Sequence, residues 1–255
     1  MNMILCTESV APAATRSNGA PRSPLRWRTV ILTACAFAAT SPMSAAFDPP
    51  PLIFTDDFEH DFNRWETTDP DPEKPFWKLA SADASYGNST QVLRVVGPSN
   101  YQPPHRSPHS IALVKGLVVG NFEMSVRTQS TNVDAGPHRD MCLFWGYQDP
   151  AHFYYVHLGA KPDPHACQIF IVNEAPRTAI TTKTAVGTPW TKGWHTVKIA
   201  RNVQDGAMAV YFDDMSEPHL SAKDKTFVYG RVGLGTFDDN GNWDDFRLHG
   251  EIVAP

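Results

Sequence analysis

The sequence lacks most of the short motifs that identify a metalloenzyme, a nucleotide-binding protein or a serine hydrolase. It has no Cys-x-x-Cys pair, no glycine-rich phosphate loop and no Gly-x-Ser-x-Gly turn. His105 and His109 are four residues apart, but Pro108 between them excludes the helix that would align them on one ion. These absences argue against a zinc site of standard spacing, a nucleotide cofactor and a nucleophile elbow.

Cysteine is also scarce, with four residues among 255. Cys6 and Cys35 lie in the N-terminal segment, so Cys142 and Cys167 remain for the rest of the chain. An exported protein permits a disulfide between them. The strand pattern described below disfavours that pairing, because it places the two side chains on opposite faces of their strands.

No apolar run reaches the roughly 20 residues that a membrane-spanning helix needs. The run from Thr29 to Ala39 is short, follows a segment with four arginines, and precedes Ser44-Ala45-Ala46. A basic flank, a short apolar stretch and a small-residue exit are typical of a signal peptide. We therefore expect residues 1–46 to be a signal peptide and the mature protein to be secreted or periplasmic.

A second route of export remains open, because Leu32-Thr33-Ala34-Cys35 fits a lipobox and Cys35 would then carry the lipid. In either case the basic leader is removed, and it contains one acid, Glu8. The remaining domain is acidic, so it has no electrostatic attraction to nucleic acid.

Proline and aromatic residues are plentiful, with 22 prolines and 11% aromatic residues. Short apolar segments separated by turn residues predict an all-β protein, a two-sheet antiparallel β-sandwich of the jelly-roll type. We expect a proline-rich lead-in over 47–53 and a single domain over 54–255. The apolar segments are 111–119, 121–128, 140–147, 152–159, 168–172, 194–200, 207–213, 230–236 and 243–248.

One hairpin is specific enough to assign side chains to faces. Residues 140–147 and 152–159 flank Gln148-Asp-Pro-Ala, whose proline suits a type I turn. Pairing about this loop puts six large side chains on the face between the sheets: Met141, Leu143, Trp145, Tyr154, Val156 and Leu158. The opposite face mixes aromatic and polar groups, which predicts an outward face that contacts something: Asp140, Cys142, Phe144, Phe153, Tyr155 and His157.

The two ends of the domain resemble the concanavalin A-like lectin/glucanase superfamily. The resemblance rests on Phe54-Thr-Asp-Asp-Phe-Glu, on Gly230-Arg-Val-Gly-Leu-Gly-Thr-Phe and on Trp243-Asp-Asp-Phe-Arg-Leu. It is similar in particular to exported 3-keto-disaccharide hydrolase type domains and, more distantly, to laminin-G modules. The resemblance implies a sandwich, but the superfamily includes lectins, hydrolases, lyases and adhesion modules.

Many sandwiches of this superfamily hold a structural calcium ion between the first and last strands, and calcium takes oxygen ligands. By that resemblance we expect Asp57 or Glu59 and Asp245 to bind calcium, with a carbonyl near Gly87 as a further ligand. The alternative is that these acids cap turns or lie on a solvated edge.

Our leading hypothesis is a domain that binds a glycan on its concave sheet. Aromatic faces stack on sugar rings, and polar neighbours fix the hydroxyl groups. For substrate binding we select Phe144, Asp140, Gln168, His138 and Arg139, and for catalysis, if there is any, His157, Tyr155, Arg127 and Glu123.

Two other classes remain open. The Glu-x-Asp-x-x-Glu motif of family 16 glycoside hydrolases is absent, although Glu123 and Asp140 could still form a carboxylate pair. A polysaccharide lyase could use His157, Tyr155, Arg127 and Gln168 to abstract a proton beside a sugar carboxylate. The third class is a non-catalytic adhesion module of the laminin-G kind.

Overall fold

The structure is a computed structural model that describes residues 50–69, 71, 73–81, 91–97 and 99–254. The chain divides into two units, Met1–Ala46 and Phe47–Pro255, and every described residue belongs to the second. The predicted signal peptide therefore lies outside the described residues. Within them, no helix is long and apolar enough to cross a membrane.

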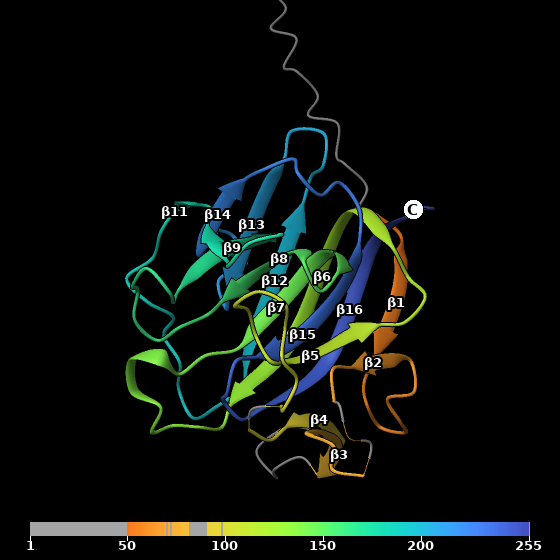
Figure 1. The fold of residues 1–255 in the computed structure, drawn as a ribbon, viewed down its shortest axis with the longest axis vertical. Helices are drawn as coiled ribbons and strands as arrows, with labels where there is room; N and C mark the ends of the chain where they lie inside the picture. The colour runs from red at the N-terminus through yellow and green to blue at the C-terminus, as the bar shows by residue number, and fades with distance from the viewer. Residues whose placement is uncertain (1–49, 70, 72, 82–90, 98, 255) are drawn as a thin grey trace, which may run out of the picture. The chain divides into compact units, whose positions relative to one another are not determined.

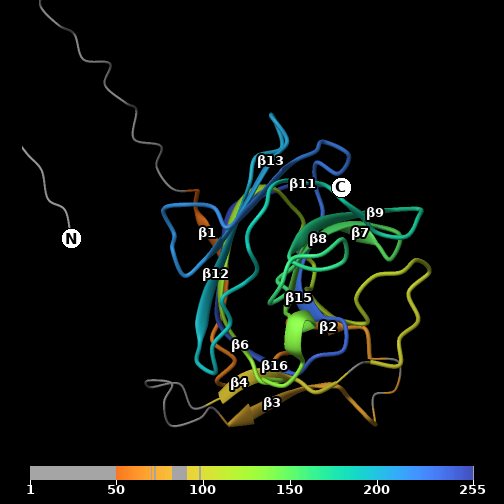
Figure 2. The same ribbon diagram turned by 90° about the vertical axis from the view of Figure 1, so that its left-hand side faces the viewer.

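The described residues form two antiparallel sheets, which lie against each other as two layers in Figure 2. The predicted β-sandwich is thereby confirmed. A short 3₁₀ helix, Gly136–His138, interrupts the connection between β6 (Val119–Ser130) and β7 (Cys142–Asp149). In Figure 1 the strands of the two sheets overlap in projection, and the strand numbers follow the order of the chain.

Sheet A has nine strands, and β16 (Gly241–Ile252) pairs with β6, β4 (Gln91–Val95) and β1 (Leu52–Asp56) in different parts of its length. The first and the last strands of the described chain, β1 and β16, are therefore neighbours in this sheet. Its path is β11 (Thr181–Lys183), β14 (Leu220–Lys223), β13 (Ala207–Phe212), β12 (His195–Arg201), β6 (Val119–Ser130), β16 (Gly241–Ile252), β4 (Gln91–Val95) and β3 (Trp77–Ser81), with β1 (Leu52–Asp56) beside β16.

Sheet B has seven strands and contains the predicted hairpin as β7 and β8. Its order is β10 (Thr178–Ala179), β9 (Gln168–Asn173), β8 (His152–His157), β7 (Cys142–Asp149), β15 (Arg231–Thr236), β5 (Ser110–Val114) and β2 (Trp65–Thr67).

The register of the hairpin is as predicted: Trp145 lies opposite Tyr154, and Leu143 lies opposite Val156. The turn is shorter than predicted, because Asp149 also pairs with His152 after an irregularity in β7. Gly146 lies in that irregular stretch with a φ of 57°, a conformation that glycine adopts without strain.

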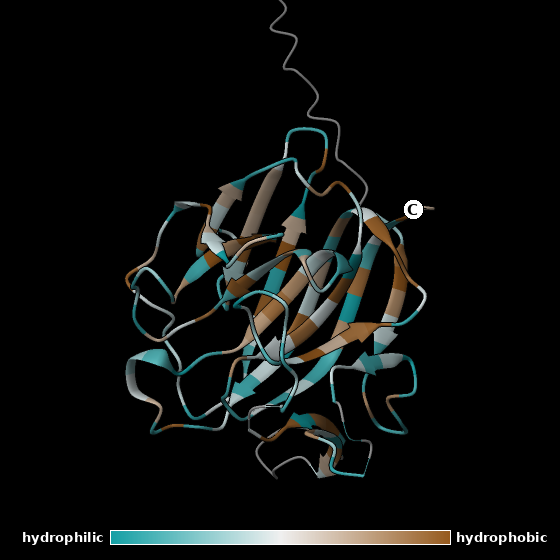
Figure 3. Cartoon of the chain, viewed as in Figure 1, coloured by the Kyte–Doolittle hydropathy of each residue, from teal (hydrophilic) through white to brown (hydrophobic). Residues whose placement is uncertain are grey.

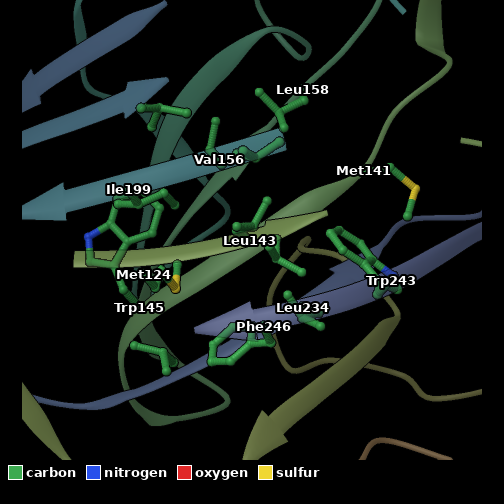
Figure 4. Close-up of a cluster of buried hydrophobic side chains, with 14 of the residues drawn as sticks. Met124, Met141, Leu143, Trp145, Val156, Leu158, Ile199, Leu234, Trp243 and Phe246 are labelled. Carbon is green, nitrogen blue, oxygen red and sulfur yellow. The ribbon is translucent and has the colours of Figure 1, made fainter. Parts of the chain in front are cut away.

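The main core lies between the sheets, as Figure 4 shows for side chains from both. All six predicted inner-face residues belong to it, from Met141 to Leu158. Strand alternation also holds in sheet A, where Met124, Val126, Val197 and Ile199 are buried in the same core. Figure 3 shows the corresponding bands of hydrophobic and hydrophilic residues along the long strands.

The outer face of sheet B carries a second apolar cluster, whose face strand alternation predicts but whose burial it does not. Its members come from β5, β7, β8 and β9, and each is at least 95% buried: Ile111, Leu113, Cys142, Phe144, Tyr147, Phe153, Tyr155, Phe170 and Val172. The segment 99–109, which we call the cover loop, crosses in front of this sheet in Figure 1.

Both cysteines of the domain are free and buried. Cys167 belongs to the core between the sheets, whereas Cys142 belongs to the cluster on the outer face of sheet B. Strand alternation predicted that the two side chains lie on opposite faces of sheet B, and this placement explains why they form no disulfide.

Candidate functional site

The outer face of sheet B presents a row of aromatic rings drawn from three adjacent strands. Tyr147 stacks on Phe153 with ring centroids 5.1 Å apart, Phe144 stacks on Tyr155 at 5.7 Å, and Tyr155 stacks on Phe170 at 5.2 Å. Gly235 leaves room for this row, because a Cβ there would lie 2.8 Å from the Phe144 ring. The row has the stacking geometry that aromatic side chains favour.

A buried polar network lies at one end of this row. His157 Nε2 donates to Asp140 Oδ2, and His157 Nδ1 donates to the carbonyl oxygen of His165 at 2.8 Å. A carbonyl oxygen and a carboxylate both accept hydrogen bonds, so these partners favour the charged imidazole, in which both ring nitrogens carry a proton. Burial lowers the pKa of His157, but the charge of Asp140 and these hydrogen bonds outweigh burial and raise it.

A second carboxylate, Asp239, joins the network. Its Oδ2 accepts from the backbone N–H of Asp140 at 2.7 Å, and its Oδ1 accepts from Asn132 at 2.7 Å. Thr236 Oγ1 donates to Asp140 Oδ1 at 3.0 Å, which joins β15 to the same network. Burial, reinforced by the charge of Asp140, raises the pKa of Asp239 to about 6.

Arg177 supplies the cation of this site, and sequence reasoning missed it. Its guanidinium carbon lies 4.4 Å from the ring centroid of Phe237 and 5.1 Å from that of Phe170. A lone arginine just before a two-residue strand carries no motif, so the sequence has no signal that could select it. Arg127, the cation selected from the sequence, lies elsewhere.

Arg127 and Glu123 lie on β6 in sheet A, whereas His157 and Tyr155 lie on β8 in sheet B. The expectation that all four share one concave sheet is wrong, because strand alternation separates inward from outward positions but does not say to which sheet a strand belongs. Glu123 instead lies 3.9 Å from Lys198, and Arg127 lies 5.8 Å from the Trp194 ring.

The remaining predicted binding residues surround one end of sheet B. Gln168 lies opposite His157 in the ladder and donates to the carbonyl of Asp163 at 3.3 Å. His138 is exposed and lies 3.7 Å from Asp163. Arg139 is buried and holds the backbone of Ser130 at 2.7 Å, so its guanidinium serves the packing of its own loop.

Phe144 and Tyr155 are fully buried, and His157 is 4% exposed. The prediction of a sugar-accessible face at these residues is wrong for the conformation described, because the chain covers them itself. The cover loop approaches the site through two contacts: Arg177 N–H donates to the carbonyl of Arg106 at 3.3 Å, and His109 lies edge-on to Phe237. Phe237 lies 6.3 Å from Tyr155 and Arg177 lies 5.1 Å from Phe170, so these two side chains, to which the loop is joined, lie over the outward aromatic residues.

The opposite end of the aromatic row reaches an open pocket of about 320 Å³, which we call the Tyr147 pocket. It is lined by Val118, Tyr147, Gln148, Tyr229, Gly230 and Arg231. Arg231 lies 5.5 Å from the Tyr147 ring and donates to Glu66 at 2.8 Å. Gly230 permits the close approach of β15 to β7, since a Cβ there would lie 2.2 Å from the backbone of Gly146.

The predicted calcium ligands are only partly assembled. Asp57 and Asp245 line one pocket of about 420 Å³, which also contains Thr55, Asp56, Arg64, Phe246 and Arg247. Glu59 does not line it, and its carboxylate accepts from the backbone of Gln91 at 3.2 Å. In the described part of the chain no three His, Cys, Asp or Glu side chains form a metal-binding group, and Gly87 lies outside that part.

Comparison with solved structures identifies similar sandwiches. The carbohydrate-binding module CBM66 of Bacillus subtilis is 14% identical with a TM-score of 0.50, over 73% of this chain and 96% of that one. Basic winged bean lectin with Tn-antigen is 15% identical with a TM-score of 0.51, over 80% and 100%. The cellulose-induced protein Cip1 is 12% identical with a TM-score of 0.52, over 80% and 100%.

No protein-family model matches the sequence. No curated protein matches it either. At identities this low the structural similarity establishes the fold alone. Two packed antiparallel sheets, a last strand paired with the first, and these similar structures lead to one conclusion: the chain has the concanavalin A-like lectin/glucanase fold.

Proposed function

We propose that this protein is an exported carbohydrate-binding domain that binds a glycan on the outer face of sheet B, at the Tyr147 pocket. The observation that carries the proposal is the combination found there: aromatic rings beside a guanidinium, an amide and a carboxylate, at an opening of about 320 Å³. Pockets of this size hold small ligands.

The chemistry of the pocket suits a sugar. The half-buried ring of Tyr229, and the small part of Tyr147 that lines the pocket, offer apolar surface to the C–H face of a pyranose. Arg231 and Gln148 offer donors, and the exposed carboxylate of Glu66 offers acceptors for hydroxyl groups. The same combination of aromatic and polar side chains led to the prediction that a glycan binds at Phe144 and Tyr155, but both of these residues are buried.

The similar structures support this proposal, because one is named a carbohydrate-binding module and another is a lectin with a bound antigen. They support glycan binding in general and do not identify the sugar or the residues.

A glycan array with the domain from Phe47 onward tests the proposal, followed by calorimetry on the best saccharide. We expect Tyr229→Ala and Arg231→Gln each to weaken binding at least tenfold. Tyr211→Ala is the matched control, because Tyr211 is a half-buried tyrosine on β13 in sheet A. Absence of binding to every saccharide, or equal losses in all three variants, would contradict the proposal.

Export and calcium are further parts of the proposal. N-terminal sequencing of the exported protein should begin at Phe47, whereas a lipid-modified Cys35 would establish the lipoprotein route. Calcium binding is proposed at the pocket of Asp57 and Asp245, where Arg64 and Arg247 are also present. No step of glycan binding depends on calcium.

A further inference from the structure

Three nitrogen and oxygen atoms beneath the cover loop have no hydrogen-bond partner among the described residues. They are Tyr155 Oη, Arg177 Nε and Arg177 Nη1, and each is buried. Leaving a buried donor unpaired costs about 1–3 kcal/mol, and more when the group is charged. Such groups are rare in folded proteins, and a missing partner is one explanation for them.

These atoms belong to one site. The Tyr155 ring stacks on Phe170, and the Arg177 guanidinium lies over the same Phe170 ring. Arg177 is also near enough to Tyr155 to oppose the rise in its pKa that burial causes. Both groups therefore contact the Phe170 ring and lie near each other, without a hydrogen bond of ordinary geometry between them.

The described chain offers Arg177 no carboxylate within ion-pair distance. Asp140 is a nearby acid that could pair with Arg177, but its carboxylate oxygens accept hydrogen bonds from His157 and Thr236. Nε–H and the Nη1 N–H groups point to different sides of the guanidinium, and each can donate to an oxygen of an anion. These buried donors are thus left for an anion from outside the chain.

The cover loop controls access to these donors. The middle of the loop, from Gln102 to Ser107, is tied to sheet B by one backbone hydrogen bond among the described residues. In it the backbone N–H of Arg177 donates to the carbonyl oxygen of Arg106 at 3.3 Å. The ends of the loop are better held, for example by Thr68 Oγ1, which donates to the carbonyl of His109 at 2.8 Å. A segment with firm ends and a weakly bonded middle opens at low free-energy cost.

We propose that the cover loop closes over a second subsite, in which Arg177 and Tyr155 bind the carboxylate of an acidic sugar. This inference rests on the proposed glycan binding and names its class of ligand. The row of rings from Tyr147 to Tyr155 lies on the same face as the open pocket, so a chain that enters there would extend toward Arg177.

The test compares uronate-containing oligosaccharides with their carboxyl-reduced counterparts, which have the same ring and linkage but no charge. We expect the wild-type domain to bind the acidic member at least tenfold more tightly. Arg177→Gln should remove this preference without affecting the neutral member. Arg177→Lys keeps the Tyr155 hydroxyl and a positive charge, so it should retain part of the preference for the acidic member. Tyr155→Phe keeps the Arg177 guanidinium but removes the hydroxyl, so it should reduce the preference.

Circular dichroism melting of each variant verifies folding, and Arg106→Ala serves as a control, because the loop is bonded through the Arg106 carbonyl oxygen. Equal affinity for the two members, or an acid preference that survives Arg177→Gln in a folded variant, would overturn the subsite and leave the proposed glycan binding intact. Absence of binding to any saccharide would overturn both.

Discussion

His157 and Asp140 form a buried ion pair whose side chains are 5% and 3% exposed. The pair joins β8 to Asp140, two residues before β7 begins, and Asp140 extends the connection to Thr236 on β15. Three adjacent strands of sheet B are therefore held at one end by a single polar network beneath Phe237. Buried ion pairs of this kind cost free energy when either partner is removed.

The first prediction concerns that cost. His157→Ala leaves the Asp140 carboxylate buried without its cation, so we expect the free energy of unfolding to fall by about 3–5 kcal/mol. Urea denaturation at pH 6 measures the change. His138→Ala is the matched control, since that imidazole is exposed, and should alter stability by less than about 0.5 kcal/mol. Similar small losses in both variants would mean that the pair is not structural.

The second prediction concerns pH. The raised pKa of His157 contributes stability that is fully present below its unfolded value of about 6.5 and is lost as pH rises through the folded value. Asp239 also holds its proton more tightly in the folded state, with a pKa of about 6, so its contribution falls as pH rises from about 4 through 6. Both effects predict a lower free energy of unfolding at pH 8 than at pH 5.

Denaturation curves at pH 5, 6, 7 and 8 check this direction. Asp239→Asn should flatten the part of the curve below pH 7, whereas Asp134→Asn, at an exposed position, should leave the curve unchanged. Asp224 has a lowered pKa, so the stability it contributes is lost only in more acidic solution, outside this window. A free energy of unfolding that rises from pH 5 to pH 8 would contradict the prediction.

The third prediction concerns the glycine that makes room for the aromatic row. A Cβ at Gly235 would lie 2.2 Å from the carbonyl oxygen of Ser110 and 2.8 Å from the Phe144 ring. Because Ser110 pairs through its backbone in β5, it cannot move aside easily. We expect Gly235→Ala to destabilise the domain by about 1–3 kcal/mol. Thermal melting measures this, with Gly193→Ala, where the nearest atom is 3.4 Å away, as the control.

Strand alternation predicted the hairpin faces, the core residues and the separation of Cys142 from Cys167, because each depends on the two-residue period of a strand. The same period could not assign Arg127 to a sheet. It also could not predict the burial of Phe144, which depends on a loop docked through contacts such as Arg177 with Arg106. The candidate site was thus found in part: the face was right, while its cation and its cover depend on long-range packing.

The fourth prediction concerns calcium. Asp57 directly follows β1, and Asp245 lies within β16, its partner strand, so an ion between them would tie the two ends of the domain together. We expect added calcium to raise the melting temperature and a chelator to lower it. Asp245→Asn should remove the difference. A melting temperature that is the same in calcium and in chelator would reject the ion.

The fifth prediction separates the two outer faces of the sandwich. Arg127 and Glu123 lie on sheet A, so Arg127→Ala and Glu123→Ala should leave the affinity for the best saccharide unchanged within twofold. Arg231→Ala, on sheet B, should weaken it at least tenfold, because Arg231 lines the pocket beside Tyr147. The ion pair of Glu123 with Lys198 is a surface pair worth about 0–1 kcal/mol, so folding is not a confounding factor. A loss of affinity in the sheet A variants with no loss in Arg231→Ala would move the glycan site to the opposite face of the protein.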